Sequence, residues 1–162
     1  LKTGNSFMKK FAAYLTASWF GLGFSPKASG TFGSLGALPL VWALAFYTSL
    51  PIMLAVAAVL FFVGVWATHQ IIKRQENKDP SLVVIDEVVG QMLSFSLVWQ
   101  HLSDWKIYIL GFALFRFFDI CKMGPVKFFD SRIHNAWGVM LDDVFAGITA
   151  AIVLYLINFY IF

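Results

Sequence analysis

Charged residues are absent from one long stretch of the chain, Ala28–Ile72, and this is the clearest pattern in the sequence. The stretch is long enough for two membrane-spanning helices of about 20 residues each. Ser49-Leu50-Pro51 lies in its middle, and proline suits the first turn of a helix but not its interior. The pattern therefore predicts a helical hairpin, with spans over Gly33–Tyr47 and Pro51–Ile71.

Three further apolar runs follow, and charged residues separate them. Val88–Ser103 and Ile107–Phe115 are joined by Asp104-Trp105-Lys106, and Val144–Phe162 comes last. Phe11–Phe24 is apolar and aromatic, but polar residues and glycines interrupt it, so we predict a helix lying in the membrane interface there. The predicted fold class is all-α: a polytopic membrane helical bundle of about four to five membrane helices plus an N-terminal interfacial helix. We expect a single domain over residues 1–162.

Composition supports a membrane protein. Hydrophobic residues make up 59% of the 162 residues and charged residues 13%, and the mean hydropathy is +0.75. A soluble chain this small has too much surface to bury so apolar a sequence. The single cysteine, Cys121, excludes a disulfide within one chain and any multi-cysteine metal site. We interpret the net charge of +3 as lysines and arginines that meet anionic lipid headgroups, with no nucleic acid partner.

The charges also predict an orientation. If the N-terminus is cytoplasmic, five crossings place every lysine and arginine except Lys106 on the inner side, as the positive-inside rule favours. Every acidic residue except Asp104 falls at or near the same face. We therefore expect the chemistry of this protein to lie on its cytoplasmic side.

A glycine- and hydroxyl-rich segment, Gly21–Ser34, comes directly before the first predicted span. Such a loop can turn backbone N–H groups and the hydroxyls of Thr31 and Ser34 toward an anion at the start of a helix. The alternative is a turn whose serine or threonine caps the helix. The sequence alone leaves both interpretations open.

Two adjacent pairs of acids enter apolar helices from the same membrane side: Asp86-Glu87 and Asp142-Asp143. Ionised carboxylates are costly at membrane depth, so a partner is expected. Adjacent helix residues point about 100° apart, so both acids of a pair cannot chelate one ion from a regular helix without help. Carboxylates converging from paired helices predict a divalent metal site, and oxygen ligands favour Mg²⁺ or a similar hard cation. The alternative is acids that complement the helix dipole.

Arg116, Asp119 and Lys122 follow one another at three-residue steps, so they share one face of a helix. This pattern is typical of a salt-bridged helix end, or of a polar face with two cations for phosphate and one acid for a metal. Arg132 and His134 lie in the next polar segment, where His134 is a candidate proton donor. A hard cation, several bases and an anion-friendly loop at headgroup level together favour a phosphorylated lipid as substrate.

Four segments carry a family resemblance: Gly23–Leu35, Ile85–Gly90, Phe115–Lys122 and Met140–Gly147. In this order they resemble the motifs of bacterial phosphatidylglycerophosphatase A. The resemblance implies Mg²⁺-dependent hydrolysis of phosphatidylglycerophosphate to phosphatidylglycerol and phosphate, in phospholipid biosynthesis. It also implies a multi-pass protein of the bacterial inner membrane, and with the charge pattern an active site that faces the cytoplasm.

Carried over by position, the acidic motifs of that family fall on five residues, which we take as the catalytic set: Asp86, Glu87, Asp119, Asp142 and Asp143. We expect Mg²⁺ to be held by Asp86, Glu87, Asp142 and Asp143, with Asp119 as a ligand or a base. The expected phosphate-binding set is Thr31, Ser34, Arg116, Lys122, Arg132 and His134. The attacking group is a water molecule or an aspartate, and the residues leave both open.

Two other function classes remain as alternatives. A small membrane transporter places its charges along a path across the bilayer, whereas the charges here gather on one side. A non-catalytic membrane assembly protein needs neither a metal nor both acid pairs, so loss of metal binding on charge-neutral substitution separates it from the enzyme.

Overall fold

The computed structural model describes residues 2–73, 81–121 and 135–161, and within these ranges it contains helices and no strand. The α-helices are α1 (Lys2–Ala17), α2 (Ser29–Tyr47), α3 (Leu50–Ile72), α4 (Ile85–Ser94), α5 (Trp105–Cys121) and α7 (Ala136–Ile161). Two 3₁₀ segments, η1 (Leu22–Phe24) and η2 (Ser96–His101), connect them. The prediction of an all-α bundle is confirmed.

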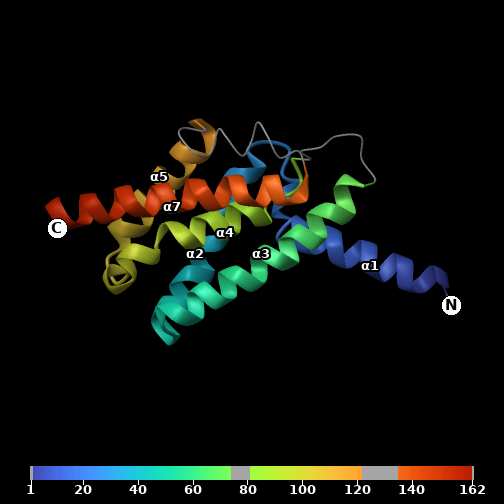
Figure 1. Cartoon of the computed structure of the whole chain (residues 1–162), viewed down its shortest axis with the longest axis horizontal. Helices are drawn as coiled ribbons and strands as arrows, with labels where there is room; N and C mark the ends of the chain where they lie inside the picture. The colour runs from blue at the N-terminus through green and yellow to red at the C-terminus, as the bar shows by residue number, and fades with distance from the viewer. Residues whose placement is uncertain (1, 74–80, 122–134, 162) are drawn as a thin grey trace.

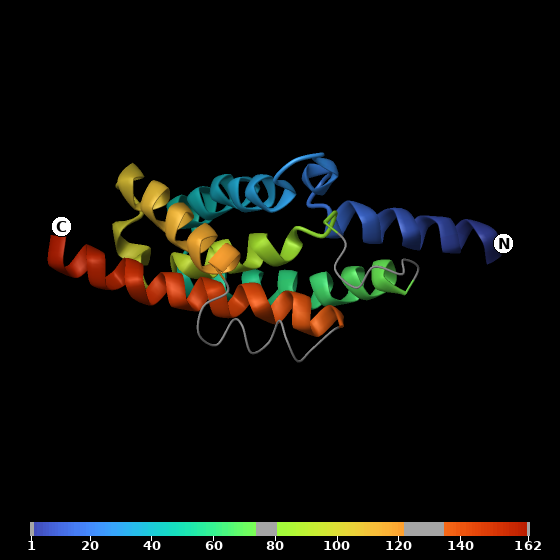
Figure 2. The same cartoon turned by 90° about the horizontal axis from the view of Figure 1, so that it is seen from above.

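The short helix α4 lies at the centre of the bundle. It packs against α2, α3, α5 and α7, and its contact with α7 is the most extensive in the molecule. Figures 1 and 2 show α7 running along most of the bundle with the shorter α4 beside part of it, while α1 projects away at one end. α1 packs on α3, and the backbone N–H of Val84 donates to the carbonyl of Ala17 at 2.8 Å, just before α4 begins.

The predicted hairpin is confirmed, because α2 ends at Tyr47 and α3 begins at Leu50 with Pro51 in its first turn. α2, α3 and residues Ala136–Tyr160 of α7 are long and apolar enough to cross a membrane. Large apolar side chains lie exposed on their outer faces, as lipid-facing helices require: Trp42, Phe46, Val59, Phe62, Ile152, Leu156 and Phe159. The described helices therefore form a membrane protein, and the number of crossings stays a prediction.

The prediction of one helix over Val88–Ser103 is wrong. α4 stops at Ser94, and within η2 the backbone of Val98 is non-helical (φ −115°, ψ 22°). The hydroxyl of Ser94 donates to the carbonyl of Gln91 at 2.7 Å and accepts from its side-chain amide at 2.9 Å. Such local bonds compete with continuation of a helix. With about 1.5 Å per residue, α4 covers only about half of the hydrocarbon thickness.

The prediction of a helix over Phe11–Phe24 is also wrong in its bounds. α1 begins much earlier and ends at Ala17. Trp19 and Phe20 then adopt left-handed φ values of 46° and 58°, which no helix continues through. The N–H of Gly21 donates to Ser18 Oγ at 3.0 Å and helps to hold this turn. The chain thus reverses before α2, and α2 reaches α4 at its first turn.

Candidate functional site

Three acidic side chains gather where α4 and α7 begin. Asp86 and Glu87 lie in the first turn of α4, and Asp143 lies in the second turn of α7. Each offers a carboxylate oxygen, and these oxygens all lie within 4.8 Å of one another. Both acids of the α4 pair therefore reach one point, although the angle of about 100° between adjacent helix residues disfavours this. We call these three residues the carboxylate cluster. Asp142 is also buried but does not belong to this cluster.

Two glycines bring the acid-bearing helices into contact. A Cβ atom on Gly147 of α7 would lie 2.3 Å from the carbonyl oxygen of Gly90 on α4. A Cβ atom on Gly90 would lie 2.5 Å from the carbonyl oxygen of Asp143. Side chains are therefore excluded here, and the two main chains touch directly. This crossing sets the spacing between Asp86 and Asp143. Both glycines belong to motifs that were singled out in the sequence, although no role was predicted for the glycines themselves.

The cluster is shielded from solvent. The exposed fractions of Asp86 and Asp143 are 7% and 5%. Three buried oxygens, Asp86 Oδ1, Glu87 Oε2 and Asp143 Oδ2, receive no hydrogen bond from the part of the chain that the structure describes. Buried carboxylates without partners are costly unless a cation joins them, and three carboxylate oxygens so close together suit a hard divalent ion. The residues present therefore fit a hard divalent cation.

The electrostatics of the two α4 acids agree with this. Asp86 and Glu87 lie outside the three long apolar helices. Burial raises the pKa of Asp86 well above its ordinary value, and the charge of Glu87 adds to the rise. Burial also raises the pKa of Glu87 to about 8, with further increases from Asp143 and Asp119. Without a cation, the site is therefore short of positive charge.

α5 adds an arginine and a fourth acid. Arg116 Nη1 donates to Asp119 Oδ2 in an ion pair whose side chains are each 15% exposed. The charge of Asp119 acts on both Asp86 and Glu87, and its carboxyl group interacts with that of Asp143. The Nε atom of Arg116 is buried and has no hydrogen-bond partner among the described residues. This leaves a donor of the guanidinium group unused beside the cluster.

The start of α2 closes another side of the site. A Cβ atom on Gly30 would lie 2.2 Å from Glu87 Oε1 and 3.0 Å from Arg116 Nη1, so the first turn of α2 lies against both side chains. Sequence reasoning missed Gly30 as a site residue. Gly30 is one of several glycines in Gly21–Ser34, and the sequence does not distinguish it from the others until the partner helix is known.

The predicted loop Gly21–Ser34 is helical from Ser29 onward, and this part of the prediction is wrong. Ala28 precedes the helix in a left-handed conformation (φ 53°), and no side chain caps it, so the capping interpretation is wrong too. Thr31 is half-buried in the first turn. Ser34 is buried, and its hydroxyl donates to the carbonyl of Gly30 at 2.9 Å. Their role toward phosphate stays a prediction.

α7 begins at Ala136 rather than at the predicted Val144. Asn135 Oδ1 accepts from the N–H groups of Trp137 and Gly138 at 2.9 and 3.2 Å, as a helix cap does. The acid pair of α7 therefore lies inside the helix rather than before it. Lys122, Arg132 and His134, also predicted as phosphate-binding residues, lie outside the described residues.

Together these features define a helical membrane protein with a buried carboxylate cluster at one end of its bundle. The model of the family described as "Phosphatidylglycerophosphatase A" matches residues 15–158. The chain belongs to this family, as the four sequence motifs predicted.

Two relatives carry the name phosphatidylglycerophosphatase A. The Escherichia coli K12 protein is 35% identical over 149 residues, covering 90% of this chain and 83% of the relative. The Haemophilus influenzae Rd protein is 35% identical over 162 residues, covering 98% of both chains. A Bacteroides thetaiotaomicron protein, named provisionally as a phosphatidylinositol-3-phosphatase, is 38% identical and covers 89% of this chain and 92% of the relative. No solved structure matches the chain.

Proposed function

We propose that this protein is a lipid phosphatase that hydrolyses phosphatidylglycerophosphate to phosphatidylglycerol and phosphate. The observation that carries the proposal is the carboxylate cluster beside Arg116, buried at one end of a membrane bundle. The names of the two relatives from Escherichia coli and Haemophilus influenzae support this substrate. The name of the Bacteroides relative favours a second substrate of the same chemical class, phosphatidylinositol 3-phosphate. Both are phosphate monoesters on a lipid headgroup.

The carboxylates of Asp86, Glu87 and Asp143 would hold Mg²⁺, with Asp142 beside them on α7. When bound, the cation supplies positive charge to the phosphoryl oxygens and makes a nearby water more acidic. The carboxylates themselves orient the site, and their burial keeps bulk water away from the charges that develop during hydrolysis.

Arg116 holds the phosphate. Its planar guanidinium can donate two parallel hydrogen bonds to a phosphoryl group, and its buried Nε is the donor not yet used. Asp119, paired with Arg116 and adjacent to Asp143, accepts the proton of the attacking water. In the same proposal Thr31, Ser34, Lys122 and Arg132 bind further phosphate oxygens, and His134 donates a proton to the leaving alcohol.

The carboxylate cluster faces the cytoplasm of a bacterial inner membrane in this proposal. The charge pattern of the sequence supports that orientation, because five crossings with a cytoplasmic N-terminus place every lysine and arginine except Lys106 on the inner side. A lipid substrate then presents its phosphomonoester at headgroup level, where the cluster meets it.

Phosphate release from detergent micelles tests the function. We would offer phosphatidylglycerophosphate, phosphatidylinositol 3-phosphate and phosphatidic acid separately, each with Mg²⁺ and with EDTA. The expected result is Mg²⁺-dependent release that is fastest from phosphatidylglycerophosphate. Faster release from phosphatidylinositol 3-phosphate would replace the substrate and keep the reaction class. No release from any of them, in folded protein, would overturn the proposal.

Charge-neutral variants test the site. Asp86→Asn and Asp143→Asn should each lower release by about a thousandfold or more, because each removes an ionised oxygen from the cluster. Asp104→Asn is the matched control, since Asp104 accepts the N–H of Lys106 in the turn before α5 and lies outside the cluster. Full activity in both cluster variants would exclude this site. Cation binding that persists in them would favour a site elsewhere.

A further inference from the structure

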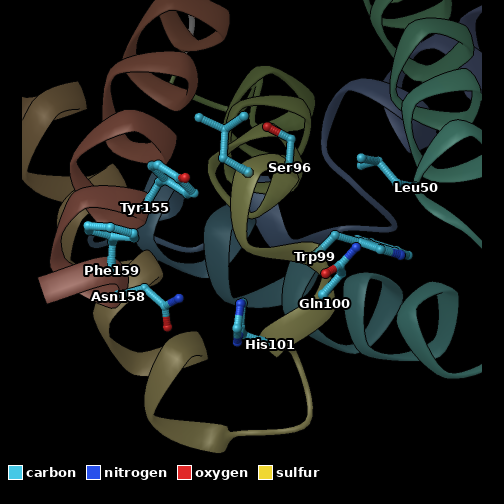
Figure 3. Close-up of a pocket in the computed structure, with 9 residues that line it drawn as sticks. Leu50, Ser96, Trp99, Gln100, His101, Tyr155, Asn158 and Phe159 are labelled. Carbon is cyan, nitrogen blue, oxygen red and sulfur yellow. The ribbon is translucent and has the colours of Figure 1, made fainter. Parts of the chain in front are cut away.

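A second cavity lies at the opposite end of the bundle from the carboxylate cluster. It has a volume of about 580 Å³, and its walls come from η2, α7 and the start of α3. Figure 3 shows the aromatic rings of Tyr155 and Phe159 on the α7 side and Trp99 across the cavity. The proposed phosphatase chemistry uses none of these residues.

Asn158 is the polar residue of α7 that lines this cavity. Its exposed fraction is 9%, and the described residues give its side-chain amide no hydrogen bond. It lies in an apolar run of a helix long enough to cross a membrane, where an unpartnered amide is costly. Figure 3 shows the Asn158 amide pointing from α7 toward the ring of His101 on η2, with the amide of Gln100 beyond His101. An amide held in this way favours a ligand that both donates and accepts hydrogen bonds.

The wall opposite α7 is the irregular segment η2. Its backbone departs from helical geometry at Val98, while Trp99, Gln100 and His101 line the cavity. Non-helical backbone at membrane depth is tolerated where protein buries it or where it lines a polar cavity. Because the helix breaks between α4 and α5, three polar or amphipathic side chains of η2 line the same cavity. A continuous helix would have spread these side chains around its axis.

The chemistry of the lining indicates the class of ligand. None of the residues that line the cavity is a lysine, arginine, aspartate or glutamate, so a charged group has no counter-ion there. Amide, imidazole and hydroxyl groups between aromatic rings suit an uncharged group that carries several hydroxyls. Tyrosine and tryptophan are also typical of the level at which lipid headgroups lie.

We propose that this cavity binds the hydroxyls of a membrane lipid headgroup, of which glycerol is the simplest case, while the charged lipid phosphate stays outside the uncharged lining. Asn158 on α7 forms hydrogen bonds with the hydroxyls of the headgroup, and Gln100 and His101 form hydrogen bonds with them from η2. This site is distinct from the carboxylate cluster, because Asp143 and Asn158 lie fifteen residues, or about 22 Å, apart along one helix. The proposal does not depend on the phosphatase activity.

Lipid retention measured by native mass spectrometry tests it. The full chain, in amine-oxide micelles with EDTA, receives equimolar dioleoyl phosphatidylglycerol and dioleoyl phosphatidylethanol, which carry the same charge and differ in headgroup hydroxyls. The wild type should retain more of the glycerol lipid. In Asn158→Leu the ratio of retained glycerol lipid to the other lipid should fall about tenfold. Tyr160→Phe is the matched control, since it removes a hydroxyl from the exposed side of the same helix end and should keep the preference.

Each other result would count against the proposal. Equal retention of both lipids by the wild type, or an undiminished preference in Asn158→Leu, would overturn it. An excess of free glycerol that displaces the lipid would assign the cavity to a free polyol and overturn the lipid assignment. Phosphate release by Asn158→Leu should stay within about twofold of the wild type, because Asn158 lies about four helical turns from Asp143. Absence of hydrolysis by the wild type would concern the phosphatase proposal alone, because lipid retention is measured in EDTA without hydrolysis.

Discussion

The two ends of the bundle hold polar groups in opposite ways. At the carboxylate cluster, acids from α4 and α7 meet where two main chains touch at Gly90 and Gly147. At the far end, uncharged side chains line an open cavity beside an irregular segment. The first end is built for charge and fixed spacing, the second for hydrogen bonding to a neutral group. One short helix, α4, creates both environments, because its start carries acids and its early end leaves space for the cavity.

The largest effect on phosphate release is expected from Asp119→Asn. The substitution keeps the shape of the side chain but removes the charge that pairs with Arg116 and the base that we assign to the attacking water. Phosphate release should fall by about a thousandfold, within the range for loss of a general base. Circular dichroism should show an intact helical fold. Activity near that of the wild type would remove Asp119 from the mechanism.

The next effect concerns the crossing of α4 and α7. Gly147→Ala would place a Cβ atom against the carbonyl of Gly90, and backbone cannot yield as a side chain does. We expect stability to fall by about 1–3 kcal/mol and hydrolysis by up to about a hundredfold, because the acids are displaced. Gly36→Ala is the control, since the atom nearest to its Cβ would be Leu22 Cδ1, which is the end of a flexible side chain and can move. Equal losses in both variants would show that the crossing has no special role.

These contacts mark the limit of what the sequence predicts. The acid pairs, the hairpin at Pro51 and the long apolar helices could be predicted, because charge and hydropathy are properties of single segments. The early end of α4 could not, since Val88–Ser103 contains no charged residue, glycine or proline after Gly90 to mark a break. The meaning of the glycines depends on which helices cross, and a single sequence does not contain that information.

A smaller effect is expected where α2 meets the cluster. Gly30→Ala would place a Cβ atom within 2.2 Å of Glu87 Oε1, which is the end of a flexible side chain and can move aside. The fold should therefore survive, with an unchanged melting temperature, while displacement of Glu87 lowers hydrolysis by about tenfold. Raising the Mg²⁺ concentration should recover part of the loss. A variant as active as the wild type would show that Glu87 tolerates displacement.

The smallest effect is expected at the far end. His101→Ala removes one side of the second cavity and none of the groups around the carboxylate cluster. Hydrolysis in micelles should change by less than about twofold, because distant sites act independently. Initial rates on the same lipid substrate measure this. A tenfold loss of hydrolysis would mean that the two ends of the bundle are coupled and do not act independently.

The contact of Gly90 with Gly147 has a consequence for the entropy of cation binding. At most ligand sites, side chains and loops lose conformational freedom when the ligand arrives. Here the separation of the two acid-bearing helices is fixed by main-chain atoms with no intervening rotamer, so that ordering is complete once the bundle has folded. Binding therefore restricts only the last torsions of three short carboxylate side chains. The site is preorganised, and its affinity for a cation is lowered little by the cost of arranging its ligands.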